Sequence, residues 1–458
     1  MKRSPRLKPN VVRAWSLESM GASAETLMRS ILPDPFVLVL LLTLIAFSGA
    51  FWFSDTTPHD ALRFWSMGFW ELLSFAMQMA LIIVTGEAIV ASPSVKFLIR
   101  TLCSVPQNRF QSIMLLTIFA LITGWIHWGI GLIGSSLLAR ELAIQAQHKR
   151  IQLHYPLLGA CAYMSMLLWH AGTTASAPLL INTPQHFLFN EIGIIPLDQT
   201  IFETSNLVVC AVLTILVPVI LYLMHPTNNI RSVDQFALYA EKSFETTPEK
   251  PKTLAEKLEH SALTNRVIGA IMLSVSLKST HLSDLNHNAV NFLLIGIGLL
   301  LHRSPIQYMQ AISKSAQSTA GVLIQFPFYG GVMALLRETH LGADIAQVFL
   351  KFANQTTLPF FAYLASLSTK FFIPSGGGEW AVEGPVFLKA AKLLQASVGK
   401  TTMGVAYGNM VGNLLQPFWA VPLLSILKLE ARDIMGFCLV VFLFAFPILG
   451  IALLSSAM

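Results

Sequence analysis

The stretch that decides the fold is FIPSGGGEW, residues 372–380, which interrupts an apolar segment long enough to cross a membrane. Each of its three glycines weakens a helix by about 1 kcal/mol relative to alanine, so the sequence predicts a break. Where a helix begins after a break, its first N–H groups have no helical partner and bind anions. We therefore expect Ser375, Gly376, Gly377 and Gly378 to face a small anionic substrate within the membrane.

The composition is that of an integral membrane protein. The chain has 458 residues, of which 54% are hydrophobic and only 12% charged, and its mean hydropathy is +0.62. Soluble domains carry charges at about twice that frequency. Because hydrocarbon requires every backbone polar group to have an internal partner, the long apolar runs predict an all-α polytopic protein with about ten to twelve segments in the lipid bilayer. These runs lie at 36–53, 68–91, 111–138, 157–181, 207–224, 267–277, 289–301, 317–336, 345–388, 401–427 and 434–456.

Several functional classes are not indicated. The net charge is +6, but the basic residues fall in loops between apolar runs, which indicates membrane topology rather than a nucleic-acid partner. The four cysteines lack paired spacing, so we expect no disulfide framework, metal site or cofactor. The chain also lacks the phosphate-loop, zinc-protease and dinucleotide motifs, so we expect no catalytic residues and no enzyme.

An internal repeat relates the two halves of the chain. The segment AYMSMLLWHAGTTASAPLL, starting at Ala162, overlays AYGNMVGNLLQPFWAVPLL, starting at Ala406, without a gap. Such repeats are typical of transporters. A second similarity, between FAMQMALIIVTG (75–86) and LIQFPFYGG (323–331), makes Gln78 and Gln325 further candidate site residues in corresponding segments.

The distribution of lysine and arginine predicts the orientation. The basic lead 1–33 places the N-terminus in the cytoplasm, with residues 11–32 either an amphipathic surface helix or a solvated tail. Loops 92–109 and 139–156 are both basic, although an apolar segment separates them. That segment must return to its own side, so we predict a re-entrant hairpin with its break in GWIHWGIGLIG (124–134).

The predicted organisation has two membrane repeats joined by a linker. The first repeat covers 34–224, a polar cytoplasmic linker covers 225–266, and an extra segment plus the second repeat covers 267–458. One additional crossing would start the second repeat from the opposite face, so the repeats should be inverted. That orientation contradicts the positive-inside rule at three lysines, which would lie outside: Lys389, Lys392 and Lys400.

Each half combines a broken re-entrant segment with a polar interruption in the following helix. The interruptions are WHAGTTASAP (169–178) and GNMVGNLLQP (408–417). Polar groups at bilayer depth are costly and usually functional, although Ser and Thr in membrane helices also bond back to their own backbone. The further candidates for substrate binding are Thr173, Thr174, Ser176, Asn409, Asn413 and Gln416.

Two carboxylates follow the triple glycine and are candidates for ion coupling. Glu379 and Glu383 lie four residues apart and share a face if the helix resumes after the glycines. In a low dielectric they disfavour double ionisation, so one holds a proton or the pair binds a cation, either H⁺ or Na⁺. The alternative is that they line an aqueous mouth near Lys389. His170 and His127 are weaker candidates, since a single histidine is more often a packing residue.

At these residues the chain closely resembles the short-chain fatty acid transporter family of bacterial inner membranes, within the ion transporter superfamily. The resemblance implies uptake of short carboxylates such as acetoacetate or butyrate by an inner-membrane carrier of inverted repeats, elevator-type and homodimeric. The similar stretches are LPDPFVLVLLLTL (32–44), GFWELLSFAMQMALIIVTG (68–86), HYPLLGACAY (154–163), STAGVLIQFPFYGG (318–331), IPSGGGEW with EGP (373–385), AYGNMVGNLLQPFWAVPLL (406–424) and ARDIMGFC (431–438).

The chain departs from that family pattern at both breaks. The pattern has His at the position of Glu379, an acidic residue near Asn409, and a glycine-rich stretch in place of 169–178. Either the coupling charge has moved or the substrate differs. We expect a cation-coupled carrier of small monocarboxylates. The alternatives are a passive channel through the same breaks, a carrier of another small organic anion, and a membrane-embedded enzyme.

Overall fold

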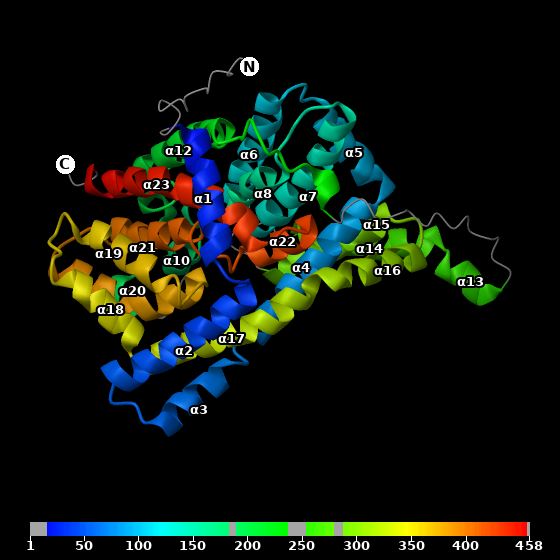
Figure 1. The fold of residues 1–458 in the computed structure, drawn as a ribbon. Helices are drawn as coiled ribbons and strands as arrows, with labels where there is room; N and C mark the ends of the chain where they lie inside the picture. The colour runs from blue at the N-terminus through cyan, green and yellow to red at the C-terminus, as the bar shows by residue number, and fades with distance from the viewer. Residues whose placement is uncertain (1–15, 183–188, 237–252, 279–286, 456–458) are drawn as a thin grey trace, which may run out of the picture.

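The computed structural model describes residues 16–182, 189–236, 253–278 and 287–455, and the regular structure within them is helical throughout (Figure 1). The helices of the first half are α1 (Leu17–Ile31), α2 (Pro35–Phe53), α3 (Pro58–Gly68), α4 (Leu73–Ala91), α5 (Pro93–Ser104), α6 (Arg109–Ile126), α7 (Trp128–His148), α8 (Tyr155–Tyr163), α9 (Ser165–Leu168), the 3₁₀ turn η2 (Trp169–Ala171), α10 (Ser176–Ile181), α11 (Phe189–Ile192) and α12 (Thr204–Leu223). Those of the second half are α13 (Leu254–Glu259), α14 (Ala262–Lys278), α15 (His287–Leu301), α16 (Pro305–Ser315), α17 (Ala320–Glu338), α18 (Leu341–Leu350), α19 (Leu358–Thr369), α20 (Gly376–Leu393), α21 (Val398–Gly412), α22 (Ala420–Leu427) and α23 (Ala431–Ser455).

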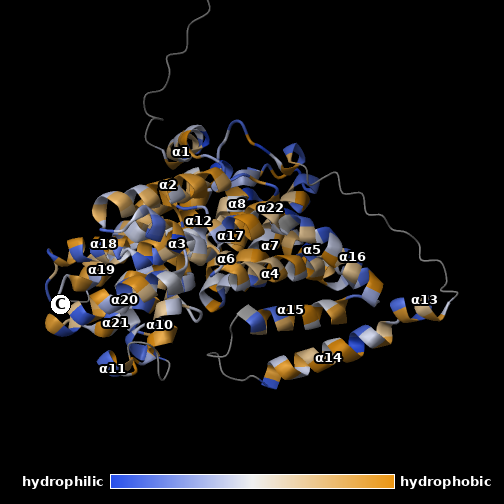
Figure 2. Ribbon diagram, turned by 90° about the horizontal axis from the view of Figure 1, so that it is seen from below, coloured by the Kyte–Doolittle hydropathy of each residue, from blue (hydrophilic) through white to orange (hydrophobic). Residues whose placement is uncertain are grey.

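The predicted all-α polytopic membrane fold is confirmed. Within the described residues, five helices are long and apolar enough to cross a membrane: α2, α6, α12, α17 and α23. The pair α4 and α5, bent by 72° at their junction, makes a sixth span if it is counted as one. Shorter apolar helices and broken segments make up the remaining predicted runs. In Figure 2, α2 and α17 are coloured hydrophobic along most of their length.

The elements occur in the same order in both halves. In the first half, the bent pair α4–α5 is followed by the hairpin α6–α7, the broken segment α8–α10 and the long helix α12. In the second half, α17–α18, α19–α20, α21–α22 and α23 follow in the same order. The four cysteines are free and buried within this bundle. The predicted boundaries of the lead, repeats and linker stay a prediction; residues 1–15 of the lead and 237–252 of the linker lie outside the described residues.

Both hairpins fold at a break that a side chain caps. His127 separates α6 from α7, and its Nδ1 accepts a hydrogen bond from Gly129 N at 3.1 Å. The arms approach so closely that a Cβ on Gly131 would lie 2.6 Å from Gly124 Cα. In the second hairpin, Ser375 caps α20 by accepting from Gly378 N at 3.2 Å. The three glycines therefore form the first turn of α20, and the break precedes them at 370–375, a difference from the sequence prediction.

The two hairpins enter the bundle from opposite ends of α12, as inverted repeats require. At the base of the first hairpin, Arg109 Nη1 lies 3.3 Å from His225 Nδ1. His225 lies just beyond the C-terminal end of α12. Beyond the second hairpin, Gly399 packs so closely that a Cβ there would lie 2.3 Å from Gln199 O, just before α12 begins. The twenty residues of α12 extend about 30 Å between these two contacts.

Three parts of the sequence prediction need correction. The segment 92–109, predicted as a loop, contains helix α5, and helix α3 lies between the predicted apolar runs 36–53 and 68–91. The short run at 267–277 is part of the longer helix α14, which packs on α15 where Gly269 meets Gly296 and Leu300. Figure 2 shows α14 and α15 as an adjacent pair at the edge of the bundle, and α15 packs against α4. Small residues let these two helices approach closely.

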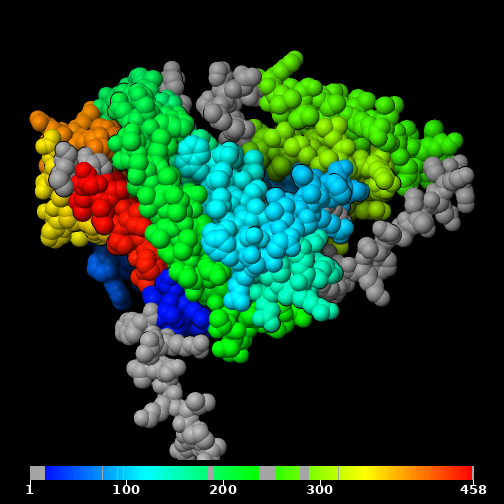
Figure 3. All heavy atoms as spheres, turned by 90° about the horizontal axis from the view of Figure 1, so that it is seen from above, coloured from blue at the N-terminus to red at the C-terminus, as the bar shows by residue number. Residues whose placement is uncertain are grey.

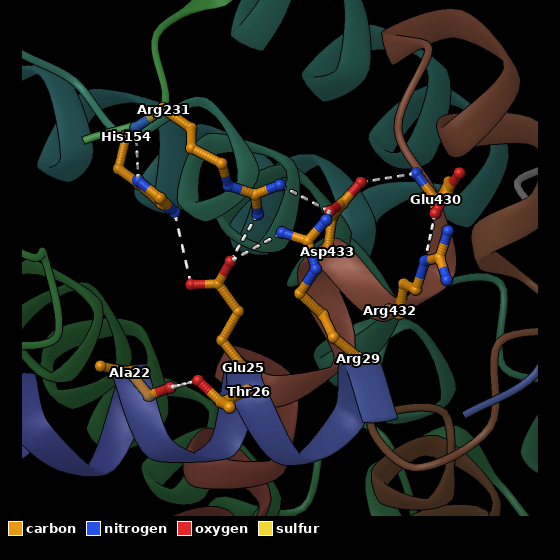
Figure 4. Close-up of polar contacts among 9 residues, drawn as sticks. All are labelled: Ala22, Glu25, Thr26, Arg29, His154, Arg231, Glu430, Arg432 and Asp433. Atoms are coloured by element: carbon orange, nitrogen blue, oxygen red, sulfur yellow. Dashed lines mark hydrogen bonds and ion pairs between the residues drawn. The ribbon is translucent and has the colours of Figure 1, made fainter. Parts of the chain in front are cut away.

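The helix α1 docks on the protein through a charged network. Figure 3 shows the surface on which α12 and α23 lie side by side, with α1 at one end of the pair. The α1 backbone is so close to α23 that a Cβ on Gly436 would lie 2.4 Å from Glu25 N. As Figure 4 shows, Arg231 donates to Glu25 at 2.5 Å and to Asp433 at 2.9 Å, which joins α1, α23 and the segment after α12. Of the two alternatives for residues 11–32, an amphipathic helix or a solvated tail, the structure has a helix over Leu17–Ile31, and this charged network, which we call the clamp, holds it on the protein.

The charge of Glu25 depends on this network. Burial raises the pKa of Glu25, but the facing His154 and Arg231 more than offset burial, so its pKa lies below the usual value. His154 Nδ1 accepts from Arg231 N at 3.1 Å, which leaves Nε2 to face Glu25 at 3.5 Å. Because the folded pKa is lowered, the clamp contributes fully at neutral pH and is lost as the pH falls through the lowered pKa.

We predict that Arg231→Gln releases α1 at neutral pH. The substitution removes the guanidinium that bonds directly to Glu25 and Asp433 and leaves only the longer contacts of Arg29, at 3.7 and 3.6 Å, which costs about 1 to 3 kcal/mol. Hydrogen exchange of the α1 amides should then accelerate by about tenfold or more. The matched control is Arg432→Gln, because Arg432 pairs with the exposed Glu430 and a surface pair contributes little. Equal protection of α1 in both variants would contradict the clamp.

Candidate functional site

The broken segments of the two halves meet in space. The start of α20 packs against η2: a Cβ on Gly376 would lie 2.7 Å from His170 Cε1 and 2.9 Å from Trp169 Cη2. The indole of Trp419, at the start of α22, donates to Pro374 O at 3.1 Å. Its ring also lies 4.9 Å from that of Trp128 at the tip of the first hairpin. All four breaks therefore converge on one region.

The hydroxyls of the first interruption tie it to the first hairpin. Thr173 N donates to Trp125 O at 2.9 Å, and its Oγ1 donates to Ile126 O. Thr174 Oγ1 accepts from Trp128 N at 3.3 Å. These bonds satisfy backbone groups that the break at His127 exposes. Ser176 begins α10 and is half-buried. Thr173 and Thr174 thus hold the two breaks of the first half together.

A matching pair of tyrosines connects each repeat to the other. Tyr163 OH donates to Asn413 O at 3.1 Å, in the interruption of the second half. Its counterpart Tyr407 donates to Asn206 Oδ1 at 2.8 Å, and Asn206 Nδ2 donates to Ala171 O at 2.9 Å, in the interruption of the first half. The internal repeat recognised in the sequence therefore has a structural role: each copy fixes the break of the other.

Two predicted candidates, Asn413 and Gln416, stabilise the second interruption. Asn413 Nδ2 donates to Met166 O at 3.3 Å, which is another contact between the halves. Gln416 Oε1 accepts from Phe418 N at 3.2 Å, and its Nε2 donates to Tyr329 OH at 3.4 Å. These bonds position the turn between α21 and α22.

A completely buried ionic cluster lies directly before and within the first turns of α20. Lys370 Nζ donates to Pro374 O and, at 3.2 Å, to Asn409 Oδ1. Asn409 Nδ2 in turn donates to Glu379 Oε2, so this amide bridges the ammonium and the carboxylate. Lys370, Glu379 and Asn409 are all 0% exposed. An unpaired charge at this depth would be strongly unfavourable, so the pair depends on its mutual neutralisation.

The second carboxylate joins the cluster through α19. Thr369 Oγ1 lies 2.6 Å from Glu383 Oε1 and 3.2 Å from Glu379 Oε1. Ser366 Oγ contacts Glu379 Oε1 and also lies 2.7 Å from Val405 O. The structure therefore places both predicted carboxylates on the face of α20 that packs against α19, and Glu383 is also 0% exposed.

Sequence reasoning missed Lys370 and its two hydroxyl neighbours. Ser366, Thr369 and Lys370 are spaced i, i+3 and i+4, which puts them on one face of a helix. A lysine inside the apolar run 345–388 is also a rare cation at membrane depth, and that alone marks a functional candidate. The signal was present beside the triple glycine, but it lay on the preceding helix.

The remaining candidates lie outside the ionic cluster. Gln78 Nε2 donates to Asn288 Oδ1 at 2.9 Å, and Asn291 Nδ2 donates to Gln78 O at 3.0 Å, so Gln78 joins α4 to α15. Gln325 is buried in α17. The ring of His170 stacks on Trp169 at 4.4 Å, and its Nε2 accepts from Ala177 N at 3.3 Å. Within the described part of the chain, no three His, Cys, Asp or Glu side chains gather to hold a metal ion.

Open space lies beside the first turn of α20. A Cβ on Gly377 would meet no heavy atom within 4 Å, and Gly377 is exposed although its neighbours are not. Gly376 and Gly377 are the first two residues of the helix, so their N–H groups have no i−4 carbonyl partner within it. The positive end of the helix dipole adds to these donors. The arrangement suits one anionic group beside Gly377.

A helical membrane bundle with paired hairpins, and with buried charges where broken segments meet, is the architecture of a membrane transporter. A sequence model described as "Short chain fatty acid transporter" matches residues 16–455, so the chain belongs to the short-chain fatty acid transporter family. Two relatives carry the name "Putative short-chain fatty acid transporter". That of Escherichia coli (strain K12) is 40% identical over 92% of this chain and 96% of its own. That of Haemophilus influenzae (strain Rd) is 39% identical over 93% and 97%.

Among solved structures, the chain is similar to MtrF of Neisseria gonorrhoeae, from a class of antimetabolite efflux pumps, with a TM-score of 0.41 and 13% identity over 94% of this chain and 97% of that chain. It is also similar to the YdaH transporter of Alcanivorax borkumensis, with a TM-score of 0.43 and 14% identity over 93% and 98%. At these values neither structure assigns a role to any residue of this chain.

We predict opposite effects of alanine at two adjacent glycines. Gly376→Ala should destabilise the fold by about 1 to 3 kcal/mol, because the methyl group would overlap His170 and Trp169. Gly377→Ala should leave stability unchanged or raise it by up to about 1 kcal/mol, because its methyl group enters open space and alanine favours helix. Thermal unfolding in detergent measures both. If Gly377→Ala were the more destabilised variant, the packing described for this turn would be wrong.

Proposed function

We propose that the protein is a secondary carrier that moves short-chain fatty acids or related small monocarboxylates, such as butyrate and acetoacetate, across the inner membrane together with a cation. The observation that carries this proposal is the buried cluster of Lys370, Glu379 and Glu383 at the point where the broken segments of both halves meet. Charges at that depth are expensive and mark ion or substrate pathways.

The substrate carboxylate fits the first turn of α20. The N–H groups of Gly376 and Gly377 and the positive helix end favour an anion, and Gly377 leaves space for it. Aromatic rings from both halves lie nearby: Trp169 and Trp419 have centroids 6.1 Å apart, and Phe418 and Trp419 5.1 Å apart. Their apolar faces suit a short acyl chain. The polar side chains of the same breaks hold the broken segments in place around this turn through their bonds to backbone groups and to Tyr329; they include Thr173, Thr174, Asn413 and Gln416.

The coupling cation is assigned to the carboxylates behind this turn. Glu379 and Glu383 share one face of α20 and are buried within hydrogen-bonding distance of Thr369. Two carboxylates beside one ammonium carry an excess negative charge that a cation neutralises.

The family relationship and the named relatives support the fatty acid substrate class. The basic N-terminal face, with α1, is assigned to the cytoplasm, and a homodimer is proposed from the family resemblance.

A carrier is favoured over a passive channel by the burial of the cluster. Lys370, Glu379 and Glu383 are each 0% exposed, whereas a permanently open pore through the breaks would hydrate them. A carrier instead alternates between states that expose the site to one side at a time. A passive channel or a carrier of another small organic anion is the alternative, and gradient-driven accumulation separates these possibilities.

We expect liposomes containing the purified protein to accumulate labelled butyrate or acetoacetate when a cation gradient is imposed. Proton and sodium gradients are applied separately, and Glu379→Gln and Glu383→Gln are tested beside the wild type. Both variants should lose gradient-driven accumulation by at least about tenfold, because each removes a carboxyl group needed to carry the coupling cation. The matched control is Glu430→Gln, since Glu430 is exposed and lies outside the cluster. It should accumulate substrate like the wild type.

Two results would contradict this function. If the wild type equilibrates butyrate without accumulating it under either gradient, the protein is a channel for that anion. If neither monocarboxylate enters at all while the protein remains folded, the substrate class is wrong.

A further inference from the structure

The hydroxyl of Thr369 joins the two carboxylates of the cluster, but it has only one proton to donate. Its Oγ1 lies 2.6 Å from Glu383 Oε1 and 3.2 Å from Glu379 Oε1, with Ser366 O also at 3.2 Å. One hydroxyl proton satisfies one of these acceptors. Both contacts of Thr369 with the carboxylates are hydrogen bonds at the same time only when Glu383 itself carries a proton. Glu383 then donates to Thr369 Oγ1, and Thr369 donates to Glu379.

The charges of the cluster also indicate that Glu383 carries one proton. Lys370 carries one positive charge, and Glu379 and Glu383 would carry two negative charges if both were ionised. All three side chains are completely buried, where an uncompensated charge is strongly unfavourable. One resident proton on Glu383 makes the empty site neutral, with Glu379 ionised opposite Lys370. A second negative charge enters only with a second proton.

A substrate carboxylate would be that second negative charge. Lys370 Nζ bonds to Pro374 O, which immediately precedes Ser375 and the first turn of α20. This bond places the ammonium near the N-terminal end of α20, so an anion that binds to the free N–H groups of that end would compete with Glu379 for it. Asn409 is the bridge between Lys370 and Glu379, and its amide has a donor and an acceptor to exchange between partners.

We propose that the coupling ion is a proton, passed from Glu383 through Thr369 to Glu379, and that neutral Glu379 releases Lys370 to hold the substrate carboxylate. This inference rests on the proposed function and names its coupling ion and its substrate-binding cation. In the transfer, the Glu383 O–H bond breaks as its proton bonds to Thr369 Oγ1, while the original Thr369 O–H bond breaks and its proton bonds to a Glu379 carboxylate oxygen, so that the hydroxyl is regenerated. Glu383 is then reprotonated from the side that supplies the substrate. On the opposite side, substrate and one proton leave together, and Glu379 pairs with Lys370 again.

The surroundings of Glu379 favour a proton over a sodium ion. Its neighbours are Ser366 and Thr369 from α19, Lys370 directly after that helix, Glu383 from α20 and Asn409 from α21, with His170 of η2 beside the start of α20. Sodium requires several oxygen ligands around one point and would sit beside the Lys370 ammonium, where like charges repel strongly at low dielectric. A proton requires only one carboxylate oxygen.

The first experiment counts protons taken up on binding. Butyrate is titrated into the purified full-length protein at pH 7 to 8 by calorimetry, in buffers with different ionisation enthalpies. The wild type should take up about one proton per butyrate, and its dissociation constant should rise about tenfold per pH unit where Glu379 is ionised, because binding requires that proton. Glu379→Gln combined with Glu383→Gln should show no proton uptake on butyrate binding and no such pH dependence, because neither position of the cluster can then take up a proton.

The second experiment tests the relay. Thr369→Val keeps the shape of the side chain but removes the hydroxyl, so proton-driven butyrate uptake into liposomes should fall by at least about tenfold. Thr369→Ser restores the hydroxyl and should recover most of the rate. Thr401→Val is the matched control, because Thr401 is buried and its hydroxyl donates to Ser397 O, at the start of its own helix, at 2.7 Å. Wild-type rates for Thr369→Val would exclude the relay.

The third variant tests Lys370 and keeps the charge balanced. Lys370→Gln combined with Glu379→Gln removes one charge of each sign, so the fold should survive while butyrate binding falls at least about tenfold relative to Glu379→Gln alone. Unchanged binding would overturn the role of Lys370. Failure of the proposed function gives a different result, since wild-type protein would then bind no butyrate. Butyrate binding with sodium uptake and without protons would retain the carrier and overturn this inference.

Discussion

The structure depends on the burial of one ammonium and two carboxylates inside a membrane bundle. Such charges are tolerated only when they neutralise one another and when their remaining donors and acceptors have partners. Lys370, Asn409 and Glu379 form a continuous chain of hydrogen bonds, and Ser366 and Thr369 complete it from the facing helix. The second hairpin holds these groups together because α19 and α20 contribute opposite sides of the cluster. A change in any of these charges alters the whole site.

The rest of the fold positions that cluster beside the first turn of α20, whose backbone N–H groups have no partner within the helix. The break at 370–375 directs the first turn of α20 toward η2, and Ser375 caps it. Tyr163 and Tyr407 extend from equivalent positions to the interruption of the opposite repeat, so the two halves hold one another in register. Polar side chains that look like substrate ligands in the sequence, such as Thr173, mainly satisfy the backbone that the breaks expose. Their role is to keep the broken helices in place.

Much of the fold could be predicted from the sequence, because membrane helices are defined by local composition. The apolar runs correspond to membrane helices or their broken parts, and the basic loops on both sides of 111–138 require the hairpin that the structure contains. Helices α3 and α5 escaped prediction because their amphipathic sequences resemble loops when only long apolar runs are counted. The composition of the site could not be predicted in full, because it depends on contacts between different helices. The spacing of Glu379 and Glu383 gave their shared face, but the partner Lys370 lies on another helix. A contact between helices is not encoded in the periodicity of either one.

The account predicts that each monocarboxylate crosses with one proton, so that the complete cycle moves no net charge. Uptake of butyrate into proteoliposomes, with the membrane potential clamped by potassium and valinomycin, tests this most directly. A pH gradient should drive accumulation, and an imposed potential of either sign should leave the initial rate unchanged, because one negative and one positive charge move together. A rate that changes with the potential at a fixed pH gradient, or accumulation that requires sodium, would contradict the account.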